Sequence, residues 1–319
     1  MKSILVTGAT GQIGTELVDY LREIYGASNV IASGRRLKEG NSVVKEGPYE
    51  LFDVTDPKRA GEIVENNKID VIYHLASILS ATGEKDPQAL WEVNMNGLCN
   101  ILEAARIRDC SVFFPSSIAV FGPQTPKDKT PQDSITRPST IYGISKVTGE
   151  LLGDYYHQKY GLDIRGLRYP GVISNIAMPG GGTTDFAVHI YYEAIKSGRY
   201  ACFLKEDTRL DFIYMPDALK GAVDLMETDP EKLEHRNAFN VTAMSITPKE
   251  LCEEIKKHIP EFTMEYEVDP VRQSIADSWP NSMDDASARS EWGWDPQYNL
   301  AAMTEDMLKI LKERINATG

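Results

Sequence analysis

Residues 3–26, SILVTGATGQIGTELVDYLREIYG, decide the fold. An apolar run leads into three glycines at three-residue spacing, and an amphipathic pattern with helical period follows at once. Glycines allow the backbone to approach a ligand closely, and the N–H groups at the start of a helix favour a phosphate. The spacing is G-x-x-G-x-x-G rather than the G-x-G-x-x-G of the usual dinucleotide fingerprint. We interpret Gly8, Gly11 and Gly14 as the turn that holds the pyrophosphate of a dinucleotide.

Short apolar runs alternate with longer helical patterns from this stretch to about residue 168. The runs are NVIASG (29–34), YELFDV (49–54), DVIYHLAS (70–77), SVFFPSS (111–117) and DIRGLRYPG (163–171). Strands that alternate with helices imply right-handed crossovers and a parallel sheet covered on both faces. We therefore expect an α/β fold with a doubly wound, Rossmann-like parallel sheet.

The alternating pattern loosens after Pro170. A glycine-rich loop at 179–186 is followed by a helical stretch at 185–198. Residues 209–228 again predict a strand, a turn and an amphipathic helix, which we expect to rejoin the main sheet. Farther on, Thr247 precedes a proline at the first position of a further predicted helix.

The chain contains no Ser/Gly/Pro-rich linker that would divide it into independent modules. We therefore predict two parts built from interleaved segments, the second a smaller C-terminal α/β substrate lobe. The dinucleotide-binding domain is predicted to comprise 1–168 plus about 205–235, and the substrate lobe about 169–204 plus 236–319.

Composition excludes several classes of function. Of 319 residues 42% are hydrophobic, and no apolar run approaches the ~20 residues that span a bilayer. The N-terminus does not resemble a secretory signal, so we expect a cytoplasmic protein without a membrane partner. A net charge of −13 disfavours nucleic acid, which needs a concentrated basic face. Four dispersed cysteines and five scattered histidines predict neither a disulfide framework nor a metal site.

Residues 142–146, YGISK, place Tyr142 and Lys146 on one face of a predicted helix. A phenol with a pKa near ~10 is a poor base, but an ammonium group and an oxidised nicotinamide would stabilise its phenolate. Ser116 and Ser117 end the fifth strand, at the edge where such sheets place ligands. A serine could fix the reacting oxygen while the phenolate takes its proton. From this stretch alone, a surface tyrosine packed on a lysine stem is the structural alternative.

Four motifs together resemble the extended, UDP-galactose 4-epimerase-like short-chain dehydrogenase/reductase superfamily: TGATGQIG, HLAS, SSIAVFG and YGISK. Long stretches of the second half, 168–195, 208–226, 237–251 and 268–285, are similar to the L-threonine 3-dehydrogenases of that superfamily. This resemblance implies oxidation of the 3-hydroxyl of L-threonine to 2-amino-3-ketobutyrate, with hydride transfer to NAD.

The resemblance also implies roles for individual residues. Tyr142 would be the base, supported by Lys146 and Ser117, and both Tyr142 and Lys146 would contact the cofactor. Further cofactor contacts are expected from Gln12, Ile13, Leu75, Ala76, Asn94 and Tyr169. Substrate contacts are expected from Ser80, Ser116, Ser117, Tyr142, Thr184 with Thr183 as its competitor, and Trp279. Without the resemblance, the simpler interpretation is that the hydroxyls of Ser80 and Thr184 and the amide of Asn94 bond to local backbone groups. Trp279 would then be a packing residue.

The end of the second strand leaves the choice between NAD and NADP open. Relatives that use NAD commonly carry an aspartate where this chain has Gly34, and Arg35 follows it. An acid there holds the ribose 2′-hydroxyl, whereas an arginine suits a 2′-phosphate. Asp53 and Val54 end the third strand and are expected to flank the adenine. We predict NAD, with NADP as the alternative.

Two other functions use the same framework. A nucleotide-sugar epimerase or dehydratase would need basic residues for a diphosphate, whereas the stretch MPGGGTTDF (178–186) is small and rich in hydroxyls. A non-catalytic dinucleotide sensor would be expected to lose the tyrosine or the lysine, and both are present. The helical stretches 90–107 and 142–161 are where this family often forms dimers, so a homodimer and a monomer are both left open.

Overall fold

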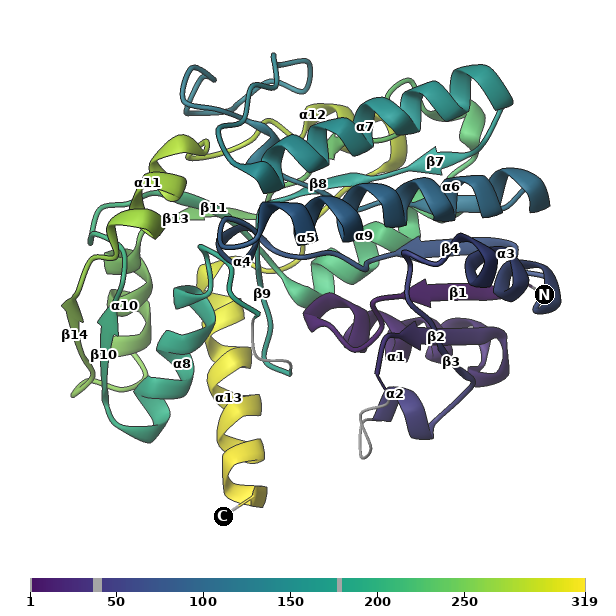
Figure 1. The fold of residues 1–319 in the computed structure, drawn as a ribbon. Helices are drawn as coiled ribbons and strands as arrows, with labels where there is room; N and C mark the ends of the chain where they lie inside the picture. The colour runs from purple at the N-terminus through teal and green to yellow at the C-terminus, as the bar shows by residue number, and fades with distance from the viewer. Residues whose placement is uncertain (1, 37–41, 177–179, 319) are drawn as a thin grey trace.

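Six parallel strands form the central sheet of the computed structural model, which describes residues 2–36, 42–176 and 180–318 (Figure 1). In spatial order they are β3 (Tyr49–Leu51), β2 (Val30–Gly34), β1 (Ile4–Thr7), β4 (Val71–His74), β5 (Ser111–Phe113) and β7 (Ile164–Arg165). The order reverses between β1 and β4, and such sheets bind ligands in the crevice at that reversal. The predicted doubly wound α/β fold is confirmed.

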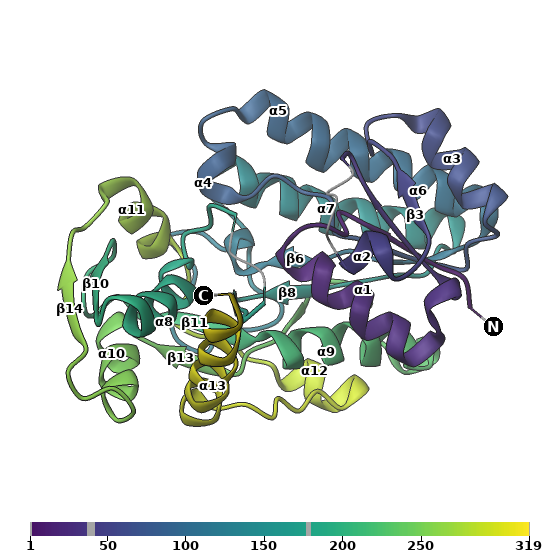
Figure 2. The same ribbon diagram turned by 90° about the horizontal axis from the view of Figure 1, so that it is seen from below.

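Helices cover both faces of this sheet (Figure 2). Leu5 packs into the core on one face, whereas Ile4 and Val6 pack on the other, because successive side chains of a strand point to opposite faces. The face of Leu5 is covered by α3 (Pro57–Asn66), α6 (Gly97–Arg108) and α7 (Ile141–Tyr160). The opposite face is covered by α1 (Gln12–Tyr25) and α9 (Met215–Glu227).

A second, three-stranded parallel sheet carries the serines of the predicted site. Its strands are β6 (Ser116–Ser117), β8 (Leu167–Tyr169) and β12 (Phe239–Asn240), with β8 in the middle. Ser117 stands opposite Tyr169 in this pairing. The stretch 111–117, which predicted one strand, is therefore divided between two sheets, because it is interrupted at Pro115, where a ladder N–H is missing.

The smaller lobe packs around a hydrophobic core of its own. Its strands are β9 (Gly171–Ile173), β11 (Leu210–Tyr214) and β13 (Met244–Ile246), which form one sheet, and β10 (Arg199–Cys202) and β14 (Thr263–Tyr266), which form another. Its helices are α8 (Phe186–Lys196), α10 (Pro248–Lys256), α11 (Pro270–Ser278) and α13 (Leu300–Thr318). The predicted helix after Thr247 is confirmed as α10, and Thr247 and Glu250 form a capping box at its start.

The segment 209–228 forms the predicted strand and helix, β11 and α9. The helix covers the main sheet beside α1, but the strand pairs with β9 and β13. The expectation that this strand rejoins the main sheet is therefore wrong. Pro170, which cannot donate to a ladder, separates β9 from β8, and β11 then pairs with β9 outside the main sheet. The proposed division into a dinucleotide domain and a substrate lobe stays a prediction.

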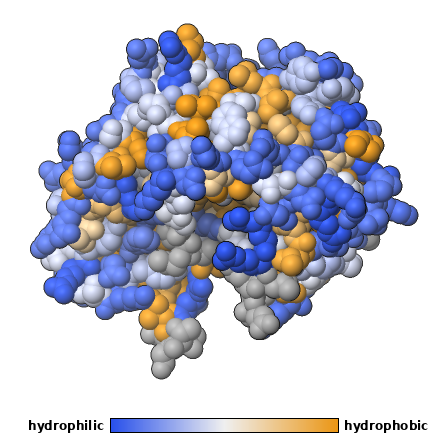
Figure 3. Space-filling model, in the orientation of Figure 1, coloured by the Kyte–Doolittle hydropathy of each residue, from blue (hydrophilic) through white to orange (hydrophobic). Residues whose placement is uncertain are grey.

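Short helices complete the fold: α2 (Ser42–Lys45), α4 (Ser80–Gly83), α5 (Pro87–Trp91), a π-helical turn (Glu92–Asn96) and α12 (Ala286–Trp292). Apolar side chains gather over α5 and α7 in Figure 3, where Trp91, Ile144 and Leu151 are exposed. In the described part of the chain, no helix combines the length and apolar character needed to span a membrane.

Candidate active site

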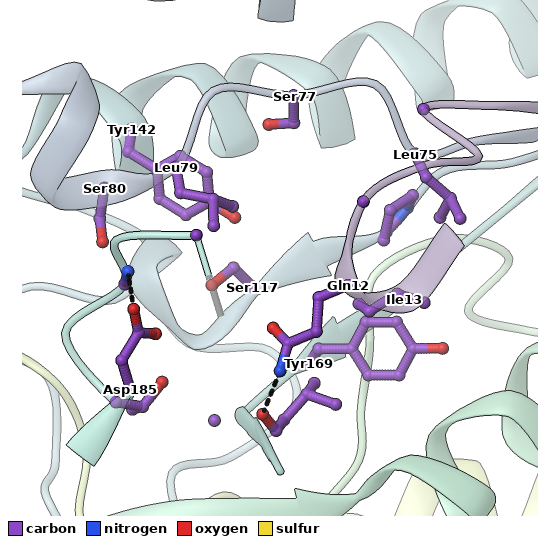
Figure 4. A pocket seen from close by; sticks show the side chains of 18 of the residues that line it. Gln12, Ile13, Leu75, Ser77, Leu79, Ser80, Ser117, Tyr142, Tyr169 and Asp185 are labelled. Atoms are coloured by element: carbon purple, nitrogen blue, oxygen red, sulfur yellow. Dashed lines mark hydrogen bonds between the residues drawn. The ribbon is translucent and has the colours of Figure 1, made fainter. Parts of the chain in front are cut away.

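A cavity of about 770 Å³ opens at the carboxyl ends of β1, β4 and β6 and reaches the smaller lobe (Figure 4). Gln12, Ile13 and Leu75 lie at one end of it, and Ser80 and Tyr142 at the other. Most residues predicted from sequence line it together: Gly8, Gly11, Gln12, Ile13, Gly14, Leu75, Ser80, Ser116, Ser117, Tyr142, Lys146, Tyr169, Thr183, Thr184 and Trp279. Arg35, Asp53, Val54, Ala76 and Asn94 are not part of its lining.

The glycine turn is shaped for a close backbone approach. Gly8 has φ +67°, and a Cβ placed on it would lie 2.7 Å from the backbone nitrogen of Ala76. A Cβ on Gly14 would lie 2.3 Å from the carbonyl oxygen of Gly8. The turn leads into the N-terminus of α1, whose free N–H groups and dipole attract a phosphate. The residues present therefore fit a dinucleotide pyrophosphate, and Ala76 serves as a wall of the turn.

Tyr49 lies beside position 34 at the end of the second strand. A Cβ on Gly34 would lie 2.7 Å from the hydroxyl of Tyr49, so a larger side chain there would displace that hydroxyl. Asp53 caps its own turn by accepting from the backbone N–H and the hydroxyl of Thr55, at 3.0 and 2.8 Å. Arg35 is exposed and Val54 is buried. The adenine and ribose contacts assigned to them stay predictions.

Tyr142 lies in the first turn of α7 and meets Ser117 across the cavity. The helix begins there because the hydroxyl of Thr140 accepts from the N–H of Gly143 at 3.1 Å. Ser117 and Tyr142 both line the cavity. Burial raises the pKa of Tyr142 to about 12, and the hydroxyl of Ser117 opposes that rise. The phenol therefore needs a positive neighbour to act as a base near neutral pH.

Lys146 supplies that positive charge from one helical turn below. Its ammonium group donates to the carbonyl oxygen of Pro115 at 2.8 Å and lies 5.5 Å from the ring centroid of Tyr142. Burial lowers the pKa of Lys146 to about 7, and the carboxylate of Glu150 opposes the fall. Burial and the charge of Lys146 lower the pKa of His74 to about 3. The imidazole is therefore neutral near pH 7 and does not supply the positive charge.

Two predicted polar residues are engaged with the protein itself. The hydroxyl of Ser116 donates to the carboxylate of Glu150, so its proton is already committed. Asn94 lies in the π-helical turn and is buried; it accepts from the N–H of Ile78 at 2.8 Å and donates to its carbonyl oxygen at 3.1 Å. Asn94 thereby fixes the loop after β4 that lines the cavity.

The far end of the cavity is rich in hydroxyl groups. Thr183 is fully buried, and its hydroxyl has no hydrogen-bond partner among the described residues. Thr184 and Ser80 also line the cavity, and Trp279, 6% exposed, closes its side toward the smaller lobe. Sequence reasoning missed Asp185, whose carboxylate accepts from the N–H groups of Gly181 and Gly182 at 2.9 and 2.8 Å. Its place directly after two threonines of the glycine-rich loop was the only signal.

Asp185 and Lys146 are the charged residues among the described residues that line the cavity. Within the same described ranges, no group of three His, Cys, Asp or Glu side chains is placed to hold a metal ion.

Residues 4–242 match the model of the NAD dependent epimerase/dehydratase family. The chain belongs to this family. An uncharacterized epimerase/dehydratase of Staphylococcus saprophyticus is 52% identical over 99% of both chains. The solved structure of an L-threonine dehydrogenase from Clostridium difficile is 58% identical, with a TM-score of 0.97 over 98% of each chain. A monomeric L-threonine 3-dehydrogenase from a metagenome database is 46% identical, with a TM-score of 0.94 over 98% of this chain and 99% of that one.

Membership of the NAD dependent epimerase/dehydratase family makes the protein an enzyme that works with a nicotinamide cofactor. The sequence-based resemblance to the extended short-chain superfamily is confirmed by the family match and by these solved structures. The choice between NAD and NADP, the roles of single residues and the oligomeric state stay predictions.

Proposed function

We propose that the protein oxidises the 3-hydroxyl of L-threonine to 2-amino-3-ketobutyrate with NAD as the hydride acceptor. The observation that carries this proposal is the similarity of the whole chain, at 58% identity, to a solved L-threonine dehydrogenase. The substrate lobe is included in that similarity. Members of this family with other substrates would be expected to differ most in that lobe, since the cofactor half serves the whole family.

The geometry around Tyr142 supports a dehydrogenase mechanism. The nicotinamide ring, when bound, supplies the acceptor for the hydride that leaves C3 of the substrate. Tyr142 takes the proton of the 3-hydroxyl at its phenolic oxygen, and the hydroxyl of Ser117 orients the same substrate oxygen. The ammonium of Lys146 stabilises the phenolate that this role requires. Loss of one proton and one hydride converts the alcohol to a ketone.

An amino-acid substrate also suits the charges of the cavity. Asp185 is the carboxylate among the described lining residues, and it faces the hydroxyl-rich end, where it could pair with an α-ammonium group. Thr183 and Thr184 offer hydroxyl donors to an α-carboxylate. A nucleotide sugar would bring a diphosphate into the same end, where the described lining residues include no arginine and where Lys146 already donates to a backbone carbonyl.

The test is to follow reduced nicotinamide by absorbance with purified protein, L-threonine and either NAD⁺ or NADP⁺. We expect a rise with L-threonine, none with UDP-sugars, and higher kcat/KM with NAD⁺. No rise with threonine under either cofactor would reject the proposed reaction. Arg35→Ala separates the cofactor question from the reaction. It should leave NAD⁺ turnover unchanged if NAD is used, and should weaken NADP⁺ turnover if Arg35 holds a 2′-phosphate.

A further inference from the structure

A buried ion pair joins α7, which carries Tyr142 and Lys146, to β8, the strand that pairs with the strand of Ser117. Glu150 lies on α7, one turn after Lys146 and two after Tyr142, and it is 6% exposed. Arg168, 7% exposed, lies on β8 and donates to both oxygens of Glu150, from Nε at 3.0 Å and from a terminal nitrogen at 2.9 Å. The hydroxyl of Ser116, on β6, donates to the same carboxylate.

Register connects this ion pair directly to Ser117. Arg168 stands opposite Ser116, so Ser117 stands opposite the next residue of β8. The other terminal nitrogen of Arg168 donates to the carbonyl oxygen of Gln132 at 2.8 Å and to the side-chain oxygen of Asn240 at 3.2 Å. The guanidinium group is therefore held from several sides. Glu150 fastens α7, and with it Tyr142, to this fixed group and to β6.

The same carboxylate sets the electric field at Lys146. The titratable groups beside Lys146 are Tyr142 and Glu150 on α7 and His74 on β4, and Arg168 on β8 is paired with Glu150. Near the start of α7, Glu84 is bonded to the N–H of Ile141. Of these, Glu150 is the acidic group that opposes the loss of the proton from Lys146. Buried charge pairs often contribute little net stability, because desolvation offsets the attraction, so an effect on the neighbouring Lys146 is a separate question from stability.

We propose that Glu150 and Arg168 are positioning residues that hold the ammonium form of Lys146 and align Ser117 with Tyr142. The proposal goes beyond the proposed reaction, but its kinetic readout rests on that reaction. Tyr142 and Lys146 share their protons as a coupled pair, so the pair loses its first proton at one macroscopic midpoint. Glu150 shifts the balance toward the form in which Lys146 keeps its proton and Tyr142 gives up its own, and this is the form that can act as a base.

The test compares the isosteric variant Glu150→Gln and the uncharged, shorter variant Arg168→Gln with wild type. Glu150→Gln makes the local potential more positive, so the midpoint of the coupled pair should fall by about one pH unit, and the plateau kcat should fall about tenfold. Arg168→Gln leaves Glu150 uncompensated, so the midpoint should rise. Asp154→Asn is the matched control, since Asp154 lies one turn farther along α7 and accepts a hydrogen bond from Asn237. The midpoint of the Tyr142–Lys146 pair should not move in this variant.

Two readouts separate this proposal from the proposed reaction. The first is the pH profile of kcat/KM for L-threonine. The second is the pH dependence of the NAD⁺ dissociation constant without substrate. The ammonium of Lys146 repels the positive nicotinamide ring, so the dissociation constant changes when the Tyr142–Lys146 pair loses its proton. If wild type does not oxidise threonine, the proposed reaction fails and the binding profile alone decides.

Opposite shifts in the two variants support the proposal. Midpoints equal to wild type in folded Glu150→Gln and Arg168→Gln, as judged by circular dichroism, would overturn it, and so would shifts in the same direction. If neither variant folds, the ion pair serves the fold without a separable effect on Lys146, which also overturns the proposal.

Discussion

Tyr142 is the single residue on which the proposed proton transfer depends. Replacing it with phenylalanine removes the phenolic oxygen and keeps the ring, so the packing of α7 is preserved. We expect Tyr142→Phe to lower kcat by at least about 100-fold, within the range that general bases contribute. The NAD⁺ dissociation constant should change less than about threefold, because the glycine turn holds the pyrophosphate. Steady-state kinetics and tryptophan fluorescence titration measure both. A variant with full turnover would remove Tyr142 from the mechanism.

Thr183 carries a buried hydroxyl without a partner among the described residues, whereas the side chain of Thr184 is only half-buried. An unsatisfied buried hydroxyl costs stability until a ligand supplies the partner. We expect Thr183→Val to leave the melting temperature unchanged or raise it, and to increase KM for threonine roughly tenfold. Thr184→Val is the matched control. A larger rise of KM in Thr184→Val would reverse the assignment.

Local motifs revealed some of the site residues, but not those defined by tertiary contacts. Tyr142 and Lys146 are visible in the sequence because they lie four positions apart on one helix. Glu150 lies four positions farther along the same helix. Nothing in the local sequence shows that it pairs with Arg168, which lies on strand β8. Asp185 was missed for a similar reason, since only the fold turns its carboxylate toward the cavity.

The turn between β1 and α1 allows a test of one whole element. A Cβ on Gly14 would lie 2.3 Å from the carbonyl oxygen of Gly8, and backbone on both sides leaves no room to adjust. We expect Gly14→Ala to displace the start of α1, to weaken NAD⁺ binding at least about tenfold and to lower the melting temperature.

Gly61→Ala is the control for Gly14→Ala. Gly61 lies inside α3, and a Cβ on it would meet nothing within 4 Å. Alanine there should stabilise the helix by up to about 1 kcal/mol without affecting NAD⁺ binding. Unchanged NAD⁺ affinity in Gly14→Ala would show that the turn tolerates a side chain and would argue against its role as a pyrophosphate cradle.

The strands were predictable as apolar runs, but not their grouping into sheets. The stretch 163–171 predicted one strand and contains parts of β7, β8 and β9, each in a different sheet. Gly166 and Pro170 divide it, and sequence alone does not say into which sheet each piece goes. The π-helical turn at Glu92–Asn96 was not predicted either. An extra residue per turn leaves the apolar periodicity of the neighbouring helices almost unchanged.

The free energy of unfolding of the whole molecule is expected to depend on Glu16. This side chain is buried on α1, and burial raises its pKa to about 7 although the hydroxyl of Ser174 donates to it. A carboxyl with a raised pKa binds its proton more tightly in the folded state, so its contribution is present at low pH and is lost between about 4.5 and 7. The loss amounts to about 3 kcal/mol at most.

We therefore expect Glu16→Gln to be more stable than wild type at pH 8 and to differ little at pH 4.5, where the wild-type carboxyl is already protonated. Urea denaturation across this range measures the difference. Glu23→Gln, an exposed change on the same helix, is the control and should follow wild type throughout. A Glu16→Gln curve parallel to that of wild type would mean that Glu16 titrates in the folded protein as it does in water.

At the scale of the whole molecule, alternating strands and helices predicted the doubly wound fold correctly. The pattern did not predict how often the chain crosses between its two cores. Neighbouring residues such as Ile213 and Tyr214 of β11 belong to different hydrophobic clusters, because successive side chains of one strand point to opposite faces. A boundary drawn between residues along the sequence therefore cannot separate the two cores cleanly.

The three-stranded sheet that holds Ser117 also determines when a nascent chain can mature. Its middle strand, β8, gains its second neighbour only when β12, at Phe239–Asn240, has been synthesised. Chains emerge from the ribosome at about 5–20 residues per second, so β6 and β8 wait several seconds with one edge open. Unpaired strand edges invite association with other chains. The edge of β8, the strand that pairs with the strand of Ser117, is thus exposed to other chains until Phe239–Asn240 has been synthesised.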